Sequence, residues 1–334
     1  MTQRRRSLLI VIVLVWGAVQ LAAQESTVYF SVVATKLFVV GAANPRTGVF
    51  CQHPSADTSW THIGPTNIRA FGVAVHPGTH QQVMYIAAGN GLHKSTDGGA
   101  TWRITTGWRI TEVLNVCPDP QDTKTVFLAC AYGIFRSTDG CASWAECTKG
   151  LGSTFTQWVL VDEAHANTVY CAAEDGAYIS TNRGDSWARM GLSVGGVRTI
   201  VQDPSDPAFL MAGTENNGIY QTTNGGTWWT KCEAGIDHTT FYAIAFDPQH
   251  PATIYAGGYV TGIYKSADRG GTWKRMNNGL DVLTFHSIAV DPHNSARVYA
   301  AAYWGGIFRT DDGAASWRRT GVADSQVWTV VIHP

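Results

Sequence analysis

Short alternations of apolar and polar residues, separated by glycine-rich turns, run through most of this chain. The segment 285–317 shows the repeating unit clearly. FHSIAVDP alternates and ends in Asp-Pro, ARVYAAA is a second apolar run, and GGIFRTDDGAASW starts with glycine, turns at Asp-Gly and leads into a fourth run. Alternation with a period of two predicts β-strands, and no helical periodicity lies between them. Each unit therefore predicts four short strands.

A tryptophan marks the same point of every unit. The seven tryptophans are Trp60, Trp102, Trp144, Trp187, Trp229, Trp273 and Trp317. They recur at intervals of 42 to 44 residues, and a period of this size indicates stacked supersecondary units. Four strands in each such interval are typical of a β-propeller blade. The sequence therefore predicts an all-β fold, a seven-bladed β-propeller of four-stranded antiparallel blades that spans residues 24–334.

The two ends of the chain are expected to complete one blade together. The last residues, QVWTVVIHP (326–334), match the first strand of a unit and stop there. The segment from Thr35 to Trp60 would then supply the later strands of the first blade. The run YFSVV (29–33) competes for the same inner position. Both arrangements remain open, with the carboxyl-terminal strand favoured. Either arrangement would hide strand edges that otherwise promote aggregation.

The first 23 residues have the order of a secretory signal. Three arginines (4–6) precede an apolar run (8–19), and small residues end at Ala23. This order predicts a signal peptide over 1–23, with cleavage after Ala23, and a secreted or periplasmic protein. The alternative is an uncleaved membrane anchor, although the run is shorter than the ~20 residues of a full span. After cleavage, no stable insertion into a membrane is expected.

Charge and cysteine content exclude some classes of protein. The chain has 24 basic and 25 acidic residues. Without the three arginines of the predicted signal, 21 basic residues remain, and the net charge is near −4 (21 − 25). This charge argues against a nucleic-acid partner. The seven cysteines show no metal-ligand spacing, and motifs for phosphate or calcium loops are missing. We therefore expect no metal, no cofactor and a monomer.

One motif, which first occurs as KSTDGGATW (94–102), contains an aspartate that could act either as a catalyst or as a structural residue of a turn. Its form is Ser-x-Asp-x-Gly-x-x-Trp, and six units carry a version of it. The acidic position is occupied by Asp97, Asp139, Asn182, Asn224, Asp268 and Asp312. An asparagine cannot act as a carboxylate base, but it accepts hydrogen bonds from nearby backbone N–H groups as aspartate does. The motif is therefore interpreted as a structural turn.

Function is expected on the face opposite these turns, here called the top face. There the second strand of each unit connects to the third, and each unit connects to the next. Near the start of the inner strands, the residues around the channel are Phe71, Leu114, Gln157, Arg198, Tyr242, His286 and Trp328. A register shifted by two would replace Leu114 with Glu112. The position two residues later, expected on the same face, is always Val or Ile.

The loops from second to third strand add further aromatic residues to the top face. These are Tyr132, Tyr259, Tyr303 and Trp304. Aromatic rings beside charged groups suit the capture of a sugar or a peptide. The alternative is that the ring residues only plug the channel. Repeat proteins carry function on their variable loops, which favours a binding role for the face as a whole.

The repeated unit resembles the Asp-box (BNR) repeats of several β-propeller families. GIFRTDDGAASW, with IAVDP before it, is similar to the repeats of sialidases, of the two-propeller xyloglucanases of glycoside hydrolase family 74, of the sortilin luminal domain and of the photosystem II assembly and stability factors. The resemblance covers nearly all of residues 24–334. It implies the propeller fold and leaves the activity open.

A glycosidase relative would need two carboxylates placed across the scissile bond. The candidates on the top face are Glu112, Glu174, Asp175 and Glu215, and their spacing selects no pair. The Arg-Ile-Pro segment of sialidases is missing, and the xyloglucanase cleft lies between two propellers, whereas this chain predicts one. The single-propeller assembly factors are similar in length, signal and blade count, and imply a partner-binding protein without catalysis.

These expectations combine into one favoured interpretation and one alternative. The favoured interpretation is a secreted, non-catalytic propeller that binds or assembles with a protein or glycan ligand through its top face. The alternative is a glycoside hydrolase or a polysaccharide-binding protein. In both cases the ring residues and the loop aromatics are the candidate ligand contacts.

Overall fold

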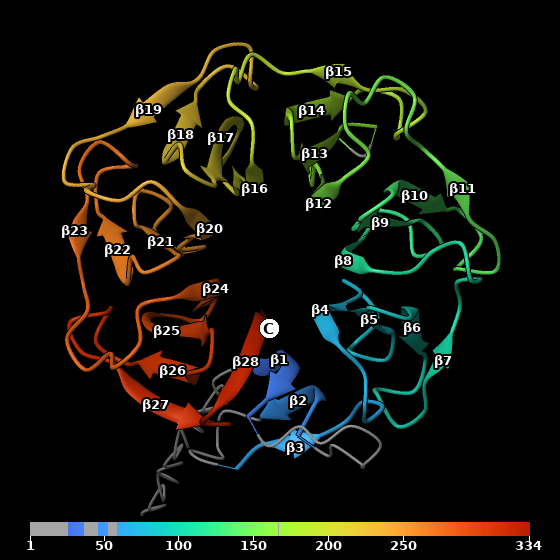
Figure 1. Ribbon diagram of the computed structural model, residues 1–334, viewed down its shortest axis with the longest axis horizontal. Helices are drawn as coiled ribbons and strands as arrows, with labels where there is room; N and C mark the ends of the chain where they lie inside the picture. The colour runs from blue at the N-terminus through green and yellow to red at the C-terminus, as the bar shows by residue number, and fades with distance from the viewer. Residues whose placement is uncertain (1–25, 37–45, 53–58, 166) are drawn as a thin grey trace, which may run out of the picture.

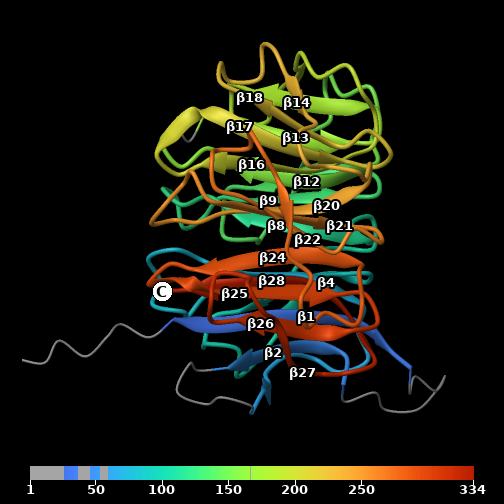
Figure 2. The ribbon, with the colours of Figure 1, turned by 90° about the vertical axis from the view of Figure 1, so that its left-hand side faces the viewer.

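Seven four-stranded antiparallel sheets surround a central channel in the computed structural model (Figure 1). The structure describes residues 26–36, 46–52, 59–165 and 167–334. Within these ranges every regular element is a strand, and no helix is long and apolar enough to cross a membrane. The strands run roughly along the axis of the ring (Figure 2). The predicted seven-bladed propeller is confirmed, while the predicted signal peptide lies outside the described residues.

The blades are numbered 1 to 7 from the one that contains both chain ends, and each has an inner, a second, a third and an outer strand. From blade 1 to blade 7, the inner strands are β28 (Ser325–His333), β4 (Ala70–Val75), β8 (Val113–Pro118), β12 (Thr156–Val161), β16 (Val197–Asp203), β20 (Phe241–Phe246) and β24 (Phe285–Asp291). The second strands are β1 (Thr27–Thr35), β5 (Met84–Ala88), β9 (Val126–Cys130), β13 (Val169–Ala173), β17 (Asp206–Thr214), β21 (Ile254–Gly258) and β25 (Asn294–Ala302). The third strands are β2 (Gly48–Gln52), β6 (Gly91–Ser95), β10 (Gly133–Ser137), β14 (Gly176–Ser180), β18 (Ile219–Thr222), β22 (Ile263–Ser266) and β26 (Gly306–Thr310). The outer strands are β3 (Thr61–His62), β7 (Arg103–Ile104), β11 (Ala145–Glu146), β15 (Ala188–Arg189), β19 (Thr230–Cys232), β23 (Lys274–Arg275) and β27 (Arg318–Gly321).

Blade 1 is built from both ends of the chain. Its inner strand is β28, as favoured from the sequence, and β28 pairs antiparallel with β1, with Phe30 opposite Val330. The run YFSVV therefore belongs to the second strand. The prediction that the later strands of this blade begin at Thr35 is wrong, because 27–35 is itself an almost wholly buried strand whose backbone needs partners on both edges. Residues 37–45 lie outside the described residues.

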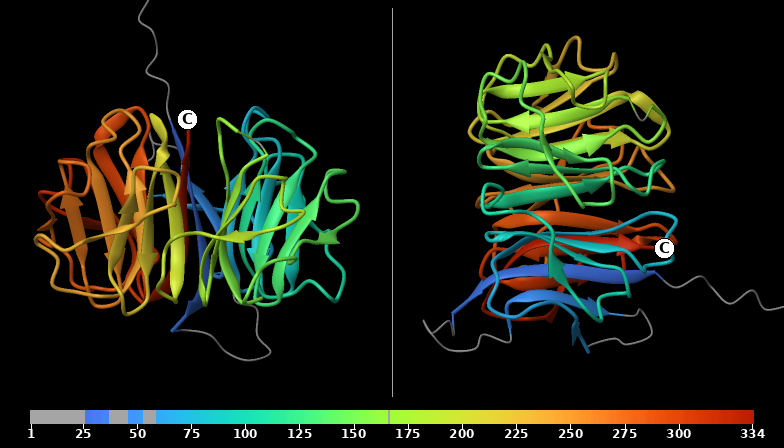
Figure 3. Two further views of the ribbon diagram at one scale, coloured as in Figure 1. Left: turned by 90° about the horizontal axis from the view of Figure 1, so that it is seen from above. Right: turned by 90° about the vertical axis from the view of Figure 1, so that its right-hand side faces the viewer.

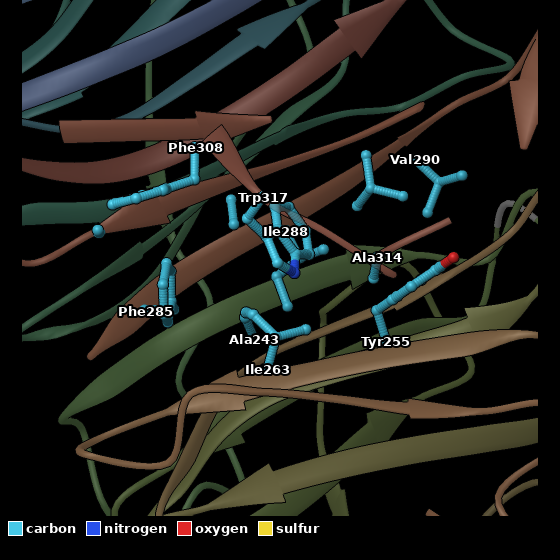
Figure 4. Close-up of a cluster of buried hydrophobic side chains, with 12 residues drawn as sticks. Ala243, Tyr255, Ile263, Phe285, Ile288, Val290, Phe308, Ala314 and Trp317 are labelled. Atoms are coloured by element: carbon cyan, nitrogen blue, oxygen red, sulfur yellow. The ribbon is translucent and has the colours of Figure 1, made fainter. Parts of the chain in front are cut away.

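A hydrophobic core fills the space between neighbouring blades. Figure 4 shows the core between blades 6 and 7, where Ala243 and Tyr255 of one blade meet Ile288 and Trp317 of the next. The indole N–H of Trp317 donates to the backbone carbonyl of Met276, in the segment that leads from blade 6, at 2.9 Å. Burial of so large a ring is favourable when its polar atom keeps a hydrogen bond. The tryptophan period is therefore the period of blade-to-blade contact.

The Ser-x-Asp motif forms the turn between the third and outer strands. In blade 2, Ser95 Oγ donates to the carboxylate of Asp97 at 2.7 Å and accepts from the N–H of Gly99 at 2.8 Å. Asp97 accepts from the N–H of Thr101 at 2.9 Å. The side-chain oxygen of Asn182 in blade 4 accepts in the same way, from the backbone four residues later, at 3.0 Å. The turn uses this oxygen, so an amide serves as well as a carboxylate.

Candidate functional site

Strand direction gathers the candidate ligand contacts at one end of the channel. Second-to-third connections and blade-to-blade connections both lie at the end opposite the Ser-x-Asp turns. In all seven blades a backbone hydrogen bond ties the two kinds of segment together; the N–H of Tyr303, for example, donates to the carbonyl of Thr284 at 2.9 Å. In the left-hand view of Figure 3, the carboxyl end of the inner strand β28 points up. The inner strands begin at the top face, so the top face is at the bottom of this view.

Each inner strand has a β-bulge near its start, and the bulged residue lines the channel mouth. In blade 6, for instance, Phe241 pairs with Gly258 and Ala243 with Gly257, so the residue between them is skipped. The seven skipped residues are Phe71, Leu114, Gln157, Arg198, Tyr242, His286 and Trp328. All seven line one cavity. The structure thus brings the ring residues together, with Leu114 rather than Glu112 at the bulge of blade 3.

The bulge changes the face that the following residues occupy. From the sequence, the Val or Ile two places after each ring residue should share its face, and this prediction is wrong for blades 2 and 3. A bulge inserts one extra residue into the strand, so Val73 and Val116 lie in the cores between blades, each with the residue just before its bulge, Ala70 and Val113. In blades 6, 7 and 1 the corresponding residues pack in such cores and also line the channel. The bulge thus separates two kinds of position in each inner strand: the Val or Ile, which packs in the core, and the bulged residue, which varies from blade to blade and lines the mouth.

Four ring residues from consecutive blades form an aromatic row (Tyr242, His286, Trp328 and Phe71) along one side of the mouth. Tyr242 stacks on His286 with ring centroids 5.0 Å apart, and His286 stacks on Trp328 at 4.2 Å. Trp328 meets the ring of Phe71 edge to face at 5.5 Å. Burial lowers the pKa of His286 to about 4, so its imidazole is neutral near neutral pH. The row is therefore an uncharged aromatic surface.

The charged part of the mouth centres on Arg198 of blade 5. Its guanidinium forms ion pairs with Glu215 and, at 3.3 Å, with Glu174. Only 16% of the Arg198 side chain is exposed, against 52% of the Glu174 side chain. A second pair joins Arg69 and Glu112 at 3.8 Å. Three of the four carboxylates considered as catalytic candidates are thus held by arginines.

Asp175, the fourth candidate carboxylate, has a different set of partners. It accepts a hydrogen bond from the hydroxyl of Tyr178 at 2.6 Å, and the side chain of Arg189 donates to its backbone carbonyl. The Tyr178 hydroxyl also accepts from the N–H of Gly152 at 3.0 Å. Among the described residues that line the channel cavity, Asp175 is not present. Asp175 therefore holds the segment that precedes blade 4 and does not face another candidate carboxylate.

Exposed apolar side chains are concentrated on the top face. Nine large hydrophobic side chains of the described chain are exposed, and seven of them belong to top-face segments. The seven are Trp108, Tyr132, Phe155, Tyr259, Val260, Leu283 and Tyr303. Trp304 extends this set, with its ring centroid 5.8 Å from that of Tyr303. Exposed apolar side chains gathered on one face are typical of a protein interaction site.

Four of these exposed residues escaped the prediction from sequence, and one of them, Val260, lies beside Tyr259 in a loop from second to third strand. Trp108, Phe155 and Leu283 lie in blade-to-blade connections, whereas the predicted aromatics lie in loops from second to third strand. Trp108 is 83% exposed, more than any other large hydrophobic residue in the described ranges. The sequence already assigned blade-to-blade connections to the top face. A search of those connections for aromatic and leucine residues would have found Trp108, Phe155 and Leu283.

The mouth offers a ligand stacking, ion pairing and hydrogen bonding. Within the described residues there is no group of three or more His, Cys, Asp or Glu side chains that could hold a metal ion. All seven cysteines are free thiols. Burial raises the pKa of Cys117 to about 11 and also raises the pKa of Cys171. Because the thiolate is the reactive form, these buried thiols are poor nucleophiles.

No family model and no curated protein sequence matches this chain, but solved structures do. The GH74 enzyme of Niastella koreensis matches with a TM-score of 0.69 and 19% identity, over 86% of this chain and 55% of that one. YCF48 from Cyanidioschyzon merolae matches with a TM-score of 0.61 and 17% identity, over 79% of this chain and 90% of that one. The extracellular domain of a one component system from B. thetaiotaomicron matches with a TM-score of 0.63 and 15% identity, over 86% of this chain and 40% of that one.

These likenesses show the fold. The chain resembles the propellers of GH74 enzymes and of YCF48, as the repeat pattern predicts. It spans between 38% and 55% of the length of the GH74 enzymes, and most of the length of YCF48. A propeller fold hosts many unrelated activities, so the function has to be argued from the site itself.

Proposed function

We propose that this protein is an extracytoplasmic binding or assembly module without catalytic activity, and that its top face binds a protein partner. The proposal rests on the concentration of exposed apolar side chains on that face, seven of the nine in the described chain. Single exposed apolar residues need no explanation, but a cluster on one face is typical of an interaction surface. The location outside the cytoplasm rests on the signal-like residues 1–23.

The mouth of the channel supports the same proposal. Rings such as Tyr259 and Tyr303 stand exposed around a recessed site that contains the aromatic row and Arg198. Tight protein interfaces are commonly centred on a pocket flanked by aromatic and arginine residues, with a surrounding rim that excludes water. One structural neighbour, YCF48, has been solved bound to a D1 peptide, which is an analogy in favour of a peptide-binding propeller.

The carboxylates favour binding over glycoside hydrolysis. A glycosidase needs two carboxyl groups that face each other across the bond to be cut. Here Glu174 and Glu215 both point to Arg198, and Asp175 is engaged with Tyr178. We therefore regard hydrolysis as the less well supported alternative.

A glycan ligand is supported less well than a protein. Sugars bind aromatic residues through a free ring face, but both faces of His286 are covered, by Tyr242 and by Trp328. Trp328 is in turn met by Phe71. The aromatic row therefore offers mainly ring edges to the channel. Edges carry N–H and O–H groups, which suit amide and carbonyl partners better than the apolar face of a pyranose.

A comparison of matched variants tests the proposal. Immobilised wild-type protein and the variants Tyr259→Ala and Trp328→Ala would be incubated with an extract of the source cells, and bound proteins quantified by mass spectrometry. Trp228→Ala is the control, because Trp228 is 75% exposed but belongs to the opposite face. We expect one partner that both top-face variants lose and the control retains. Release of reducing sugar from xyloglucan or a sialoside, abolished by Glu215→Gln, would refute the proposal.

A further inference from the structure

The mouth and the channel behind it form one cavity of about 720 Å³ with an uneven lining. Its depth is lined mainly by three consecutive inner strands, through residues 243–246, 287–290 and 329–332. Alanine, valine, isoleucine and hydroxyl side chains predominate there. In the described lining the charged side chains are those of the two arginines and two glutamates at the mouth, Arg69, Arg198, Glu112 and Glu215. A charged group that entered beyond them would lose its hydration without gaining an ionic partner.

The arginine and glutamate side chains at the mouth are already paired with one another. Arg198 carries one positive charge and is paired with two glutamates, Glu174 and Glu215, so this cluster has a net charge of −1 (1 − 2). Arg69 and Glu112 form a neutral pair. Among the described residues that line the mouth, no cation is therefore left unpaired for an anionic ligand. An approaching carboxylate would have to displace a glutamate from Arg198 and would meet a net negative charge on its way.

The aromatic row supplies hydrogen-bonding atoms that the protein does not use. Neither the hydroxyl of Tyr242, the ring nitrogens of His286 nor the indole N–H of Trp328 makes a hydrogen bond within the described part of the chain. A neutral imidazole offers one donor and one acceptor. Trp158 of blade 4 also lines the cavity, but its indole N–H is buried and is not available to a ligand. The hydroxyl of Tyr242, one imidazole nitrogen of His286 and the indole N–H of Trp328 can each donate, so a carbonyl oxygen is a complementary ligand group.

We propose that the channel mouth selects an uncharged group that joins a ring to a carbonyl or amide, and that it rejects the corresponding carboxylate. The apolar depth would accept the ring, and the edges of Tyr242, His286 and Trp328 would hydrogen-bond the polar end. This inference rests on the proposed binding function and narrows it, because it states what the partner places in the channel, namely an aromatic side chain with an uncharged carbonyl or amide group beside it. A neutral side chain fits, and an acidic one does not.

Three probes of nearly identical shape test the selection by charge. Benzamide is neutral, benzoate is an anion and benzamidinium is a cation, and each can be titrated against the full protein by ligand-observed NMR. We expect benzamide to bind at least roughly tenfold more tightly than benzoate, a difference of about 1.4 kcal/mol, and we expect benzamidinium, which the net charge of −1 attracts, to bind more tightly than benzoate. Loss of benzamide binding in Trp328→Ala, with binding retained in Trp228→Ala, would locate the site. Equal or tighter binding of benzoate would overturn the inference.

A change of charge at the mouth should reverse the selection. The double substitution Glu174→Gln and Glu215→Gln takes the Arg198 cluster from −1 to +1 and keeps the side-chain shapes. We expect benzoate to gain at least roughly tenfold in affinity. The matched control is Glu146→Gln with Glu163→Gln, which removes the same total charge from the outer strand of blade 3 and from the turn after β12. An equal gain in the control would contradict the role of Arg198. If the double variant does not fold, Glu174→Gln alone serves, since that side chain is half exposed.

The probes separate this inference from the proposed function. If benzamide does not bind but the protein partner is still lost in Trp328→Ala, the selection for a neutral group is wrong and the partner-binding role stands. If benzamide binds as expected and the top-face variants retain every partner, the channel is a small-ligand site and the proposed protein interface is wrong.

Discussion

The imidazole of His286 and the indole of Trp328 lie face to face across the junction of blades 7 and 1, with ring centroids 4.2 Å apart and planes inclined by 16°. This contact joins the last blade to the one built from both chain ends. Because the loss of hydration in the stack keeps the imidazole neutral, acidification must either charge a partly buried ring or release it from the stack. The junction that closes the propeller is therefore sensitive to pH.

Stability should fall as the pH is lowered from about 6.5 to 4, in part through His286. Its pKa is lowered from 6.5 to about 4 in the folded protein, so in this window the unfolded chain binds a proton at this residue and the folded chain does not. The unfolded state gains on the order of 1 to 3 kcal/mol. Urea unfolding at pH 7 and pH 4.5 would show the loss. His286→Phe keeps a ring that cannot be protonated, and should reduce the difference; an unchanged difference would exclude His286 as its source.

Arg269 should stabilise the contact between blades 5 and 6. It follows the aspartate of the blade-6 turn and donates to Asp203 at 2.7 Å and to Asp206 at 2.8 Å. The Asp203 side chain is fully buried, so Arg269→Ala would leave a buried carboxylate without its cation, at a cost of about 1 to 3 kcal/mol. Arg103→Ala, on an exposed outer strand, should change the free energy of unfolding by less than about 0.5 kcal/mol. Equal losses in urea unfolding would argue against the buried ion pair.

The turn carboxylates should tolerate amide but not alanine substitution. Asp97→Asn retains the oxygen that accepts from the backbone, and asparagine already fills this position in blades 4 and 5. We therefore expect nearly unchanged Tm in Asp97→Asn and a clear decrease in Asp97→Ala, measured by circular dichroism. Ser95→Ala should also lower Tm, because Ser95 is buried and binds both Asp97 and Gly99. A large loss in Asp97→Asn would show that the turn needs the negative charge.

Removal of β28 should open the ring. Deletion of 325–334 exposes one edge of the buried strand β1 along its full length, removes Val327 and Val330 from the core and uncovers their neighbours there, such as Phe30. An unpaired apolar strand edge promotes association with other chains. We expect loss of the cooperative thermal transition and aggregation in size-exclusion chromatography. Removal of Pro334 alone, which is exposed and follows the strand, is the control and should leave a folded protein. A monomeric, cooperatively folded product of the larger deletion would contradict closure by this strand.

The repeat made the architecture predictable from sequence. Seven tryptophans at a regular interval fix the blade count, and the presence of Asn182 and Asn224 among the turn residues shows that the turn needs an acceptor and not an acid. Strand alternation then assigns each loop to one of two faces. These inferences depend on local chemistry that recurs along the chain, so an interpretation made for one unit can be tested against the sequence of the other units.

The arrangement of the mouth depends on contacts that no single unit contains. The alternation of apolar and polar residues does not reveal a bulge. Val73 was therefore predicted to share the face of Phe71 at the mouth, although it packs in the core. The pairing of Arg198 with Glu174 and Glu215 joins loops of blades 4 and 5 to an inner strand. Asp175 turns instead toward Tyr178. Side-chain direction at the end of a loop is set by such tertiary contacts, which spacing along the chain does not reveal.

The seven bulges place the mouth residues at positions that lie outside the regular pairing of the strands. Each mouth residue is the extra residue of its strand and has no partner in the ladder, so its identity can change without moving the register of the sheet. Recognition and architecture are thereby encoded at separate positions. The stacked rings of His286 and Trp328 are an exception to free exchange, because they also join two blades. A library that varies the bulged residues alone, on an otherwise constant chain, should yield folded propellers whose binding preferences differ.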